Sequence, residues 1–195
     1  MLKNLIAGAA VALMSFALTA PSQARGTETI ESQIITGFAP FTPPDGEILF
    51  EDGTVKKLTD YPGELVLATV WFTTCPNCQI EMPELSKLSK ILQDQGVSNI
   101  RVLPISIDEV VFREPPADAM KRVRKYYDRK KLDHLPVALD VSARNAGRLF
   151  NPDPVGTPTT FFISPTGDVI AVLQGWKVDW TSPESIAYLR SLAGV

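Results

Sequence analysis

The segment ELVLATVWF, residues 64–72, is a nearly continuous apolar run with several β-branched members. A run of this kind predicts a strand that is buried on both faces of a sheet, because a half-exposed strand would alternate apolar and polar residues. A second run of the same character, IRVLPISID, covers residues 100–108. Between the two, apolar residues recur at helical spacing until Gly96, which predicts a helix. A strand, a helix and a strand in this order predict an α/β layered fold.

Turn signals and periodicity predict the other elements. Residues 48–55 are expected to form a β-hairpin around Gly53, and residues 159–175 a second hairpin around the turn PTGD. The remaining predicted elements are a helix over 117–131, a strand over 135–140, a helix over 142–150 and a final helix that begins at Pro183.

The N-terminus has the pattern of a secretory signal peptide. Lys3 precedes an uncharged, mostly apolar run from Leu5 to Leu18, and Ser22-Gln23-Ala24 offers a small–x–small cleavage site. We therefore expect a signal peptide over 1–24, cleavage after Ala24 and export to the periplasm. The alternative is an uncleaved segment that tethers the protein to the membrane, although the run is shorter than the roughly 20 residues that span a bilayer.

The mature chain would have 171 residues, which suits one domain. Residues 25–37 are polar and without periodicity, so they are predicted to be a flexible lead-in to a domain over 38–195. Loss of Lys3 leaves 18 basic and 22 acidic residues, and this mild acidity argues against nucleic acid as a partner. We expect the protein to be a monomer.

The only two cysteines of the chain, Cys75 and Cys78, stand at the predicted junction of a buried strand and a helix. There the unpaired N–H groups and the helix dipole favour a thiolate, which is the reactive form of cysteine. Pro76 suits the first helical position because it has no N–H to satisfy there. A structural clip would stabilise the fold by only roughly 2 kcal/mol. A zinc site would need about four ligands, and the chain offers two thiols and His134. A redox pair is therefore the favoured interpretation.

The stretches VWFTTCPNCQIEMPEL and GTPTTFFISPTG together resemble the thioredoxin superfamily, and most of all its exported TlpA/ResA/CcmG branch of thiol-disulfide oxidoreductases. The resemblance extends from about Phe38 to the C-terminus. It implies a thioredoxin-like fold with a central mixed sheet flanked by helices. It also implies an N-terminal hairpin and an inserted helix and strand, matched by the segment 107–140, which begins with IDEVV and ends with LDHLPVALD.

The resemblance also assigns roles to individual residues. Cys75 and Cys78 would form the redox-active disulfide, with Cys75 exposed and attacking and Cys78 buried and resolving. Glu81 matches an acidic residue of the ResA branch that would move protons at the buried thiol. Thr157 and Pro158 match the residue and cis-proline that face the thiols, where a protein substrate could pair with the backbone. The other residues expected to contact substrate are Trp71, Thr74, Pro76 and Asn77.

Two departures from the pattern concern the partner and the proton acceptor. Thioredoxin has a buried aspartate where this chain has Thr69, so Glu81 is expected to take its place. Thr74 replaces the tryptophan that usually precedes the first cysteine. Trp176 and Trp180 follow the last strand, either beside the substrate groove or in the core.

The direction of electron flow has two possible answers. The architecture favours a reductase of protein disulfides, for example in cytochrome c or copper-protein maturation, supplied by a membrane electron donor of the DsbD/CcdA type. The dipeptide Pro76-Asn77 is closer to the oxidant DsbA, so a thiol oxidase is an alternative.

Two other classes of protein with related folds match the sequence less well. A copper chaperone of the Sco type would use His134, although its cysteines are one residue further apart. A peroxiredoxin is excluded, because Phe72 and Cys75 occupy the place of its required threonine. No cofactor and no metal are expected at the site.

Overall fold

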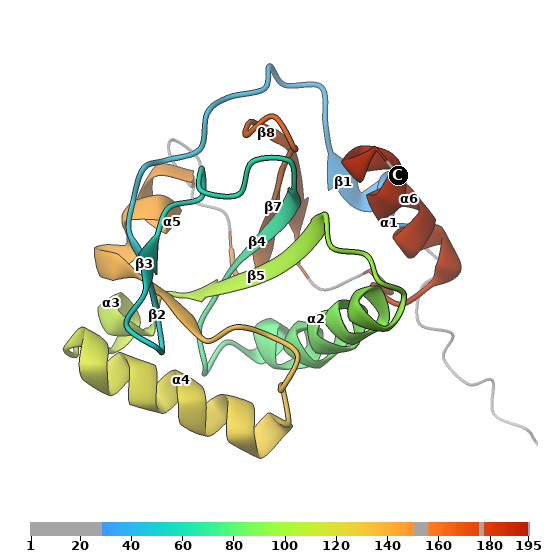
Figure 1. Ribbon diagram of the computed structural model, residues 1–195. Coiled ribbons are helices and arrows are strands. Elements are labelled where there is room, and N and C mark those ends of the chain that lie inside the picture. Colours follow the sequence, from blue (N-terminus) through green and yellow to red (C-terminus); the bar gives the residue numbers. More distant parts are fainter. Residues whose placement is uncertain (1–28, 150–155, 176–177, 195) are drawn as a thin grey trace, which may run out of the picture.

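The computed structural model describes residues 29–149, 156–175 and 178–194, arranged as helices on both sides of one sheet (Figure 1). The strands are β1 (Ile34–Ile35), β2 (Ile48–Phe50), β3 (Val55–Lys56), β4 (Leu65–Trp71), β5 (Ile100–Ser106), β6 (Ala138–Asp140), β7 (Thr159–Ile163) and β8 (Val169–Gln174). The helices are α1 (Ile30–Gln33), α2 (Pro76–Asp94), α3 (Asp108–Phe112), α4 (Pro116–Lys130), α5 (Arg144–Leu149) and α6 (Pro183–Ala193), and a 3₁₀ turn η1 (Val141–Ala143) precedes α5.

The sheet is mixed and has the strand order β1-β8-β7-β4-β5-β6-β2-β3. The central strands β4 and β5 are parallel and joined by α2, whereas β7 pairs with β4 antiparallel. These features confirm the predicted α/β thioredoxin-like fold with a mixed sheet. The predicted hairpins are β2–β3 and β7–β8. The inserted strand β6 joins β5 to β2.

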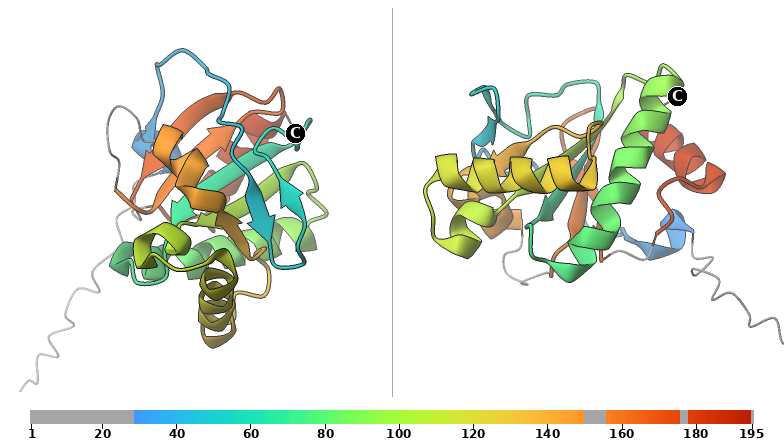
Figure 2. Two further views of the ribbon diagram at one scale, coloured as in Figure 1. Left: turned by 90° about the vertical axis from the view of Figure 1, so that its left-hand side faces the viewer. Right: turned by 90° about the horizontal axis from the view of Figure 1, so that it is seen from below.

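Two clusters of buried side chains lie on the two faces of the sheet. One face packs against α1, α2, α4 and α6, and the other against α5 and the segment around Leu58 and Tyr61. Figure 2 shows α2 and α4 side by side on the first face. All seven residues of β4 are buried, as its apolar run predicts for a strand covered on both faces.

Helix α2 buries one face from Cys78 to Leu92. Its buried apolar residues are Met82, Leu85, Leu88 and Leu92, at the spacing of a helix that packs on a sheet. Ile80, which the periodicity assigned to the same face, instead points outward and is 44% exposed. The helix ends before Gly96, whose φ of 68° is the left-handed conformation that glycine adopts most readily.

Residues 29–37 differ from the flexible lead-in that the sequence predicts. Ile30 in α1 is fully buried in the core, and Ile34 and Ile35 of β1 pair with Leu173 and Val172 of β8. The sequence of this segment gave no signal for α1 and β1, because tertiary contacts, and not periodicity within the segment, stabilise these two short elements.

The predicted helix over 142–150 is shorter than expected. It is α5 from Arg144, with η1 before it, and residue 150 lies outside the described ranges.

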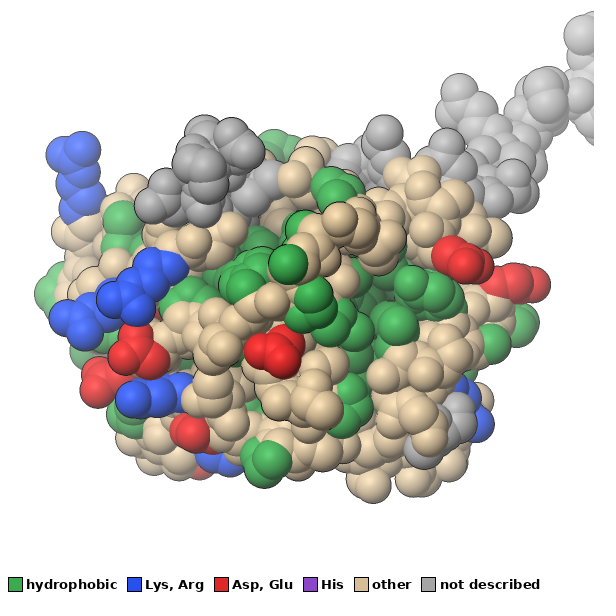
Figure 3. Space-filling view, turned by 90° about the horizontal axis from the view of Figure 1, so that it is seen from above, with side chains coloured by type: hydrophobic (Ala, Val, Ile, Leu, Met, Phe, Trp, Pro, Cys, Tyr) green, Lys and Arg blue, Asp and Glu red, His purple; other side chains and the backbone are tan. Residues whose placement is uncertain are grey.

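Within the described ranges, no helix combines the length and the apolar character needed to cross a membrane. On the face seen from above in Figure 3, apolar side chains lie in the middle and basic side chains lie toward the left.

Candidate functional site: a disulfide at the start of α2

The two cysteines lie where β4 leads into α2. Cys75 is the N-cap residue of the helix, Pro76 is its first residue, and Cys75 and Cys78 are joined by a disulfide. The backbone N–H of Cys78 donates a hydrogen bond to Sγ of Cys75 at 3.1 Å. This donor is one of the N–H groups left free by the first turn of a helix, and it would stabilise a thiolate on Cys75 after reduction.

Both sulfur-bearing residues are buried in the disulfide form. Cys75 is 2% exposed and Cys78 is fully buried, so the expectation of an exposed Cys75 is wrong for this form. The exposed neighbours are Thr74, Pro76 and Asn77, which form a rim beside the disulfide. Their exposure leaves these three residues accessible to a partner, and their contact with a substrate stays a prediction.

Thr157 and Pro158 face the disulfide from the segment before β7. The peptide bond between them is cis. The carbonyl oxygen of Thr157 lies 3.5 Å from Sγ of Cys75, and its Oγ1 can donate to the same sulfur from 3.5 Å. Cys75 and Thr157, 82 positions apart in the chain, thus meet at the Cys75 sulfur, as the resemblance implies.

Trp71 does not belong to the substrate surface. It is fully buried, and its ring packs against Tyr126 and Tyr127 of α4, with centroids 5.2 and 5.9 Å away. Its Nε1 has no hydrogen-bond partner among the described residues. The assignment of Trp71 to substrate contact is therefore corrected: it is a core residue that packs α4 against the end of β4.

Glu81 lies one helical turn after Cys78 and is 3% exposed. Burial raises the pKa of its carboxyl to about 8, and a hydrogen bond from Nε1 of Trp180 to Oε1, at 3.0 Å, opposes this rise. Residues three apart on a helix have Cβ atoms about 5–6 Å apart, so the side chains of Cys78 and Glu81 start from neighbouring positions on the buried face of α2. A carboxyl that titrates near neutral pH is suited to exchanging protons with a thiol.

The strand position that holds an aspartate in thioredoxin carries no ionisable group here. The hydroxyls of Thr69 and Thr160 are both buried and hydrogen-bonded to each other at 2.8 Å across β4 and β7. Because each hydroxyl has the other as its hydrogen-bond partner and neither residue is ionisable, this pair offers the cysteines no acid or base. Trp180 is fully buried, which places it in the core, whereas Trp176 lies outside the described residues.

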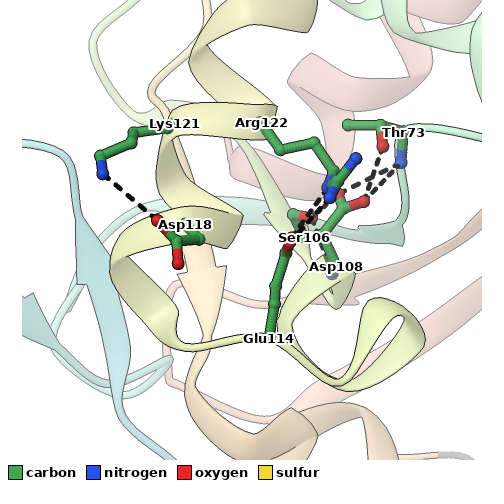
Figure 4. A network of polar contacts seen from close by, with 7 residues as sticks. All are labelled: Thr73, Ser106, Asp108, Glu114, Asp118, Lys121 and Arg122. Atoms are coloured by element: carbon green, nitrogen blue, oxygen red, sulfur yellow. Dashed lines mark hydrogen bonds and ion pairs between the residues drawn. The ribbon is translucent and has the colours of Figure 1, made fainter.

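Asp108, a buried carboxylate that the sequence analysis missed, anchors the loop before Cys75. It accepts hydrogen bonds from the backbone N–H and Oγ1 of Thr73 and from Oγ of Ser106 (Figure 4). Burial raises its pKa, whereas these bonds and the charge of Arg122 lower it. Trp71 and Ser106 are paired in the parallel strands β4 and β5, so the segments after both strands leave the sheet at one edge. A polar residue just after a second core strand was the available signal.

Thr73→Val is expected to lower the free energy of unfolding by about 1–3 kcal/mol, because it removes the hydroxyl donor from a buried carboxylate and leaves that oxygen short of a partner. Urea denaturation measures the change. Thr74→Val is the matched control: the same substitution at the exposed neighbouring residue should change stability by no more than about 0.5 kcal/mol. Equal effects of the two variants would show that Asp108 does not anchor the loop through Thr73.

His134 lies far from the disulfide. Its Nδ1 is 3.3 Å from Oε1 of Gln93, which follows Cys78 by 15 residues on α2. At 1.5 Å per residue, Gln93 and Cys78 are about 22 Å apart along the helix. The described residues contain no group of three or more side chains of the metal-ligating types His, Cys, Asp and Glu. A metal site shared by His134 and the cysteines, as the copper-chaperone alternative requires, is therefore not formed.

Three of the six basic residues of α4 pair with acidic residues. Arg122 pairs with Glu114 and Arg124 with Glu51, both through two nitrogens, and Lys121 pairs with Asp118 at 3.2 Å. The buried face of the helix is formed by Ala119, Val123, Tyr126 and Tyr127. These pairs favour a solvated face over a docking surface for an acidic partner.

The sequence matches the family model described as AhpC/TSA family over residues 40–172. It is 31% identical over 135 residues to the thiol-disulfide oxidoreductase ResA of Geobacillus thermodenitrificans, which covers 69% of this chain and 68% of that protein. It is 29% identical over 129 residues to the ResA of Bacillus subtilis, covering 65% of this chain and 63% of the relative.

Two solved structures share the fold at lower identity. A structure described as the thiol:disulfide interchange protein DsbE from Chlorobium tepidum has a TM-score of 0.58 at 22% identity, over 80% of this chain and 97% of the other. The exposed lipoprotein thioredoxin Etrx1 of Streptococcus pneumoniae has a TM-score of 0.54 at 24% identity, over 80% of this chain and the whole of the other. The family model covers more than half of the chain, so the chain belongs to the AhpC/TSA family and is a ResA-like thiol-disulfide oxidoreductase with the redox pair Cys75 and Cys78.

Proposed function

We propose that this protein is an exported reductase of protein disulfides. The observation that carries the proposal is the surroundings of the Cys75 sulfur. In the described part of the chain, the polar groups in contact with it are the N–H of Cys78 and the backbone oxygen and hydroxyl of Thr157, with no basic side chain among them. Strong oxidants of this chemistry stabilise their reduced thiolate, whereas burial without a nearby cation disfavours the thiolate.

The substrate class follows from the rim around the disulfide. Thr157 brings a backbone oxygen to the attacking sulfur, and an extended peptide segment could pair with that backbone as an added strand does. Ile80 supplies an apolar contact one turn along the exposed face of α2. These features support protein disulfides, and not small disulfides, as the substrates.

Glu81 would supply the proton chemistry of the cycle. The Cys75 thiolate attacks a substrate disulfide and forms a mixed disulfide. Glu81 then accepts the proton of the Cys78 thiol while that sulfur attacks Cys75 and releases the reduced substrate. A carboxyl whose pKa is raised by burial to about 8 can hold this proton at neutral pH and release it when the disulfide is next reduced.

The location and partners are inferred from the N-terminal sequence and from the chemistry. The signal-peptide pattern over 1–24 supports export to the periplasm. A reductase in an oxidising compartment needs electrons from the cytoplasmic side, which supports a membrane donor of the DsbD/CcdA type. Thiols of apocytochrome c or a copper-protein disulfide are candidate substrates.

The reduction potential of the Cys75–Cys78 couple tests the direction of electron flow. We expect a value more negative than about −200 mV, in the range of the glutaredoxins and thioredoxin. Equilibration of the purified protein with glutathione or dithiothreitol buffers, followed by alkylation and mass spectrometry, gives this value. A potential near the −120 mV or so of DsbA would replace the reductase by the thiol oxidase.

A further inference from the structure

Trp180 connects the segment before α6 to the active-site helix. Its indole is fully buried and stacks on Phe162 of β7, with ring centroids 6.3 Å apart and an angle of 22° between the rings. Its Nε1 donates a hydrogen bond to Oε1 of Glu81 at 3.0 Å. The two residues are 99 positions apart in sequence, so this bond exists only in the folded chain.

The two oxygens of Glu81 have different surroundings. Oε1 accepts the indole N–H, whereas Oε2 is buried and has no hydrogen-bond partner among the described residues. An indole N–H is a donor only, so it can satisfy an acceptor oxygen but cannot accept a proton from a carboxyl O–H. A protonated Glu81 therefore places its proton on Oε2.

We propose that Trp180 is a positioning residue for Glu81: its indole N–H holds Oε1, so that Oε2 is the oxygen that gives and takes the proton at Cys78. This inference rests on the proposed acid–base role of Glu81, and it adds the residue that orients the carboxyl and the atom that carries the proton.

Each step of the exchange balances with the proton on Oε2. When a partner thiolate attacks Sγ of Cys75, the Cys75–Cys78 bond breaks and a mixed disulfide forms between the partner and Cys75. The electron pair of the broken bond goes to Sγ of Cys78, which takes the proton from Oε2 of Glu81. In the reverse direction, the Cys78 thiol returns the proton to Oε2, its sulfur attacks Cys75, and the partner sulfur leaves as a thiolate.

The groups that face Glu81 make its titration simple to follow. The raised pKa has two causes, burial and the opposing bond from Trp180, and no charged group of the described residues contributes to it. Cys75 at the N-cap and Cys78 on its own helix do not titrate while they form the disulfide, and Glu84, three residues after Glu81, is a second carboxyl on that helix. From β7 and from the segment before α6, it is the aromatic side chains of Phe162 and Trp180 that form the stacked pair beside it. In the oxidised protein, the two cysteines therefore do not affect the titration of Glu81.

The test is Trp180→Phe, with Trp71→Phe as the matched control. Both variants remove one buried indole from the same core, but only the Trp180 indole is bonded to Glu81, since Nε1 of Trp71 has no partner in the described part of the chain. Carboxyl ¹³C NMR of the oxidised, ¹³C-Glu-labelled protein gives the titration of Glu81. We expect Trp180→Phe to move it upward by about one pH unit, because a bond that favours the charged form is lost, and Trp71→Phe to leave it unchanged. Equal titrations in the wild type and Trp180→Phe would overturn the inference.

A second measurement separates this inference from the role of Glu81 itself. We measure, at a series of pH values, the rate at which the reduced protein resolves a mixed disulfide. In Trp180→Phe, this pH–rate profile should shift by the same amount as the titration of the Glu81 carboxyl. A shifted titration with an unchanged rate profile would keep the Trp180–Glu81 bond but refute the proton transfer at Cys78. If Trp180→Phe does not fold, a benzothienylalanine at this position keeps the bicyclic ring and replaces the N–H by sulfur. The same shift is then expected, and its absence would contradict the proposal.

Discussion

Replacement of Cys75 by serine is expected to reduce disulfide exchange by at least about 10³-fold, because a hydroxyl in this position cannot form the mixed disulfide. Replacement of Cys78 by serine should also stop turnover, but at a later step. Cys75 would still attack the substrate, and the mixed disulfide would accumulate because the second sulfur is missing. Reduction of a protein disulfide by the purified reduced variants measures the loss. Near wild-type turnover in either variant would contradict a two-cysteine mechanism.

Glu81→Gln is expected to change the pH dependence of stability more than any other single substitution in the site. Burial raises the folded-state pKa from the ordinary 4.5 to about 8. Between these pH values the unfolded carboxyl has lost its proton and the folded one retains it, so the unfolded state binds fewer protons. Stability therefore falls as pH rises from about 4.5 to about 8 and loses nothing further to this group above that.

The variant lacks this titration, so its stability relative to the wild type should rise by up to about 5 kcal/mol over the same interval. Urea denaturation of both oxidised proteins at pH 4.5, 6 and 8 measures the difference. The variant should also resolve mixed disulfides more slowly, by about 10² or more, because the proton acceptor is gone. Parallel stability profiles for the two proteins would show that Glu81 is ionised at neutral pH in the folded state.

The sequence was sufficient to predict the central elements and the redox pair. Periodicity and turn residues identified β4, α2 and β5, because a doubly buried strand and an amphipathic helix carry their signals in their own residues. The roles of Thr157 and Glu81 came from the resemblance, since neither residue is distinctive by itself. Their positions relative to the disulfide depend on tertiary structure. For Thr157, the pairing of β7 with β4 brings the residue to Cys75.

The missed features depend on contacts between distant segments. Asp108 could have been read as a solvated first-turn residue of α3, but the fold brings it to Thr73, 35 residues earlier. The resemblance assigns Trp71 to substrate contact, but helix α4 covers it with two tyrosines. The segment 29–37 lacks periodicity, and only the edge of β8 and the core give it structure.

The identity of the cysteine whose sulfur attacks the substrate disulfide tests the central claim most directly. A reduced Cys78→Ser variant is mixed with a protein substrate that carries one disulfide, and the trapped complex is digested without reduction for mass spectrometry. The account predicts a mixed disulfide through Cys75, whose sulfur receives the N–H of Cys78 and faces Thr157. A reduced Cys75→Ser variant should trap none. A complex that forms instead through Cys78 in this second variant would contradict the assignment of Cys75 as the attacking residue.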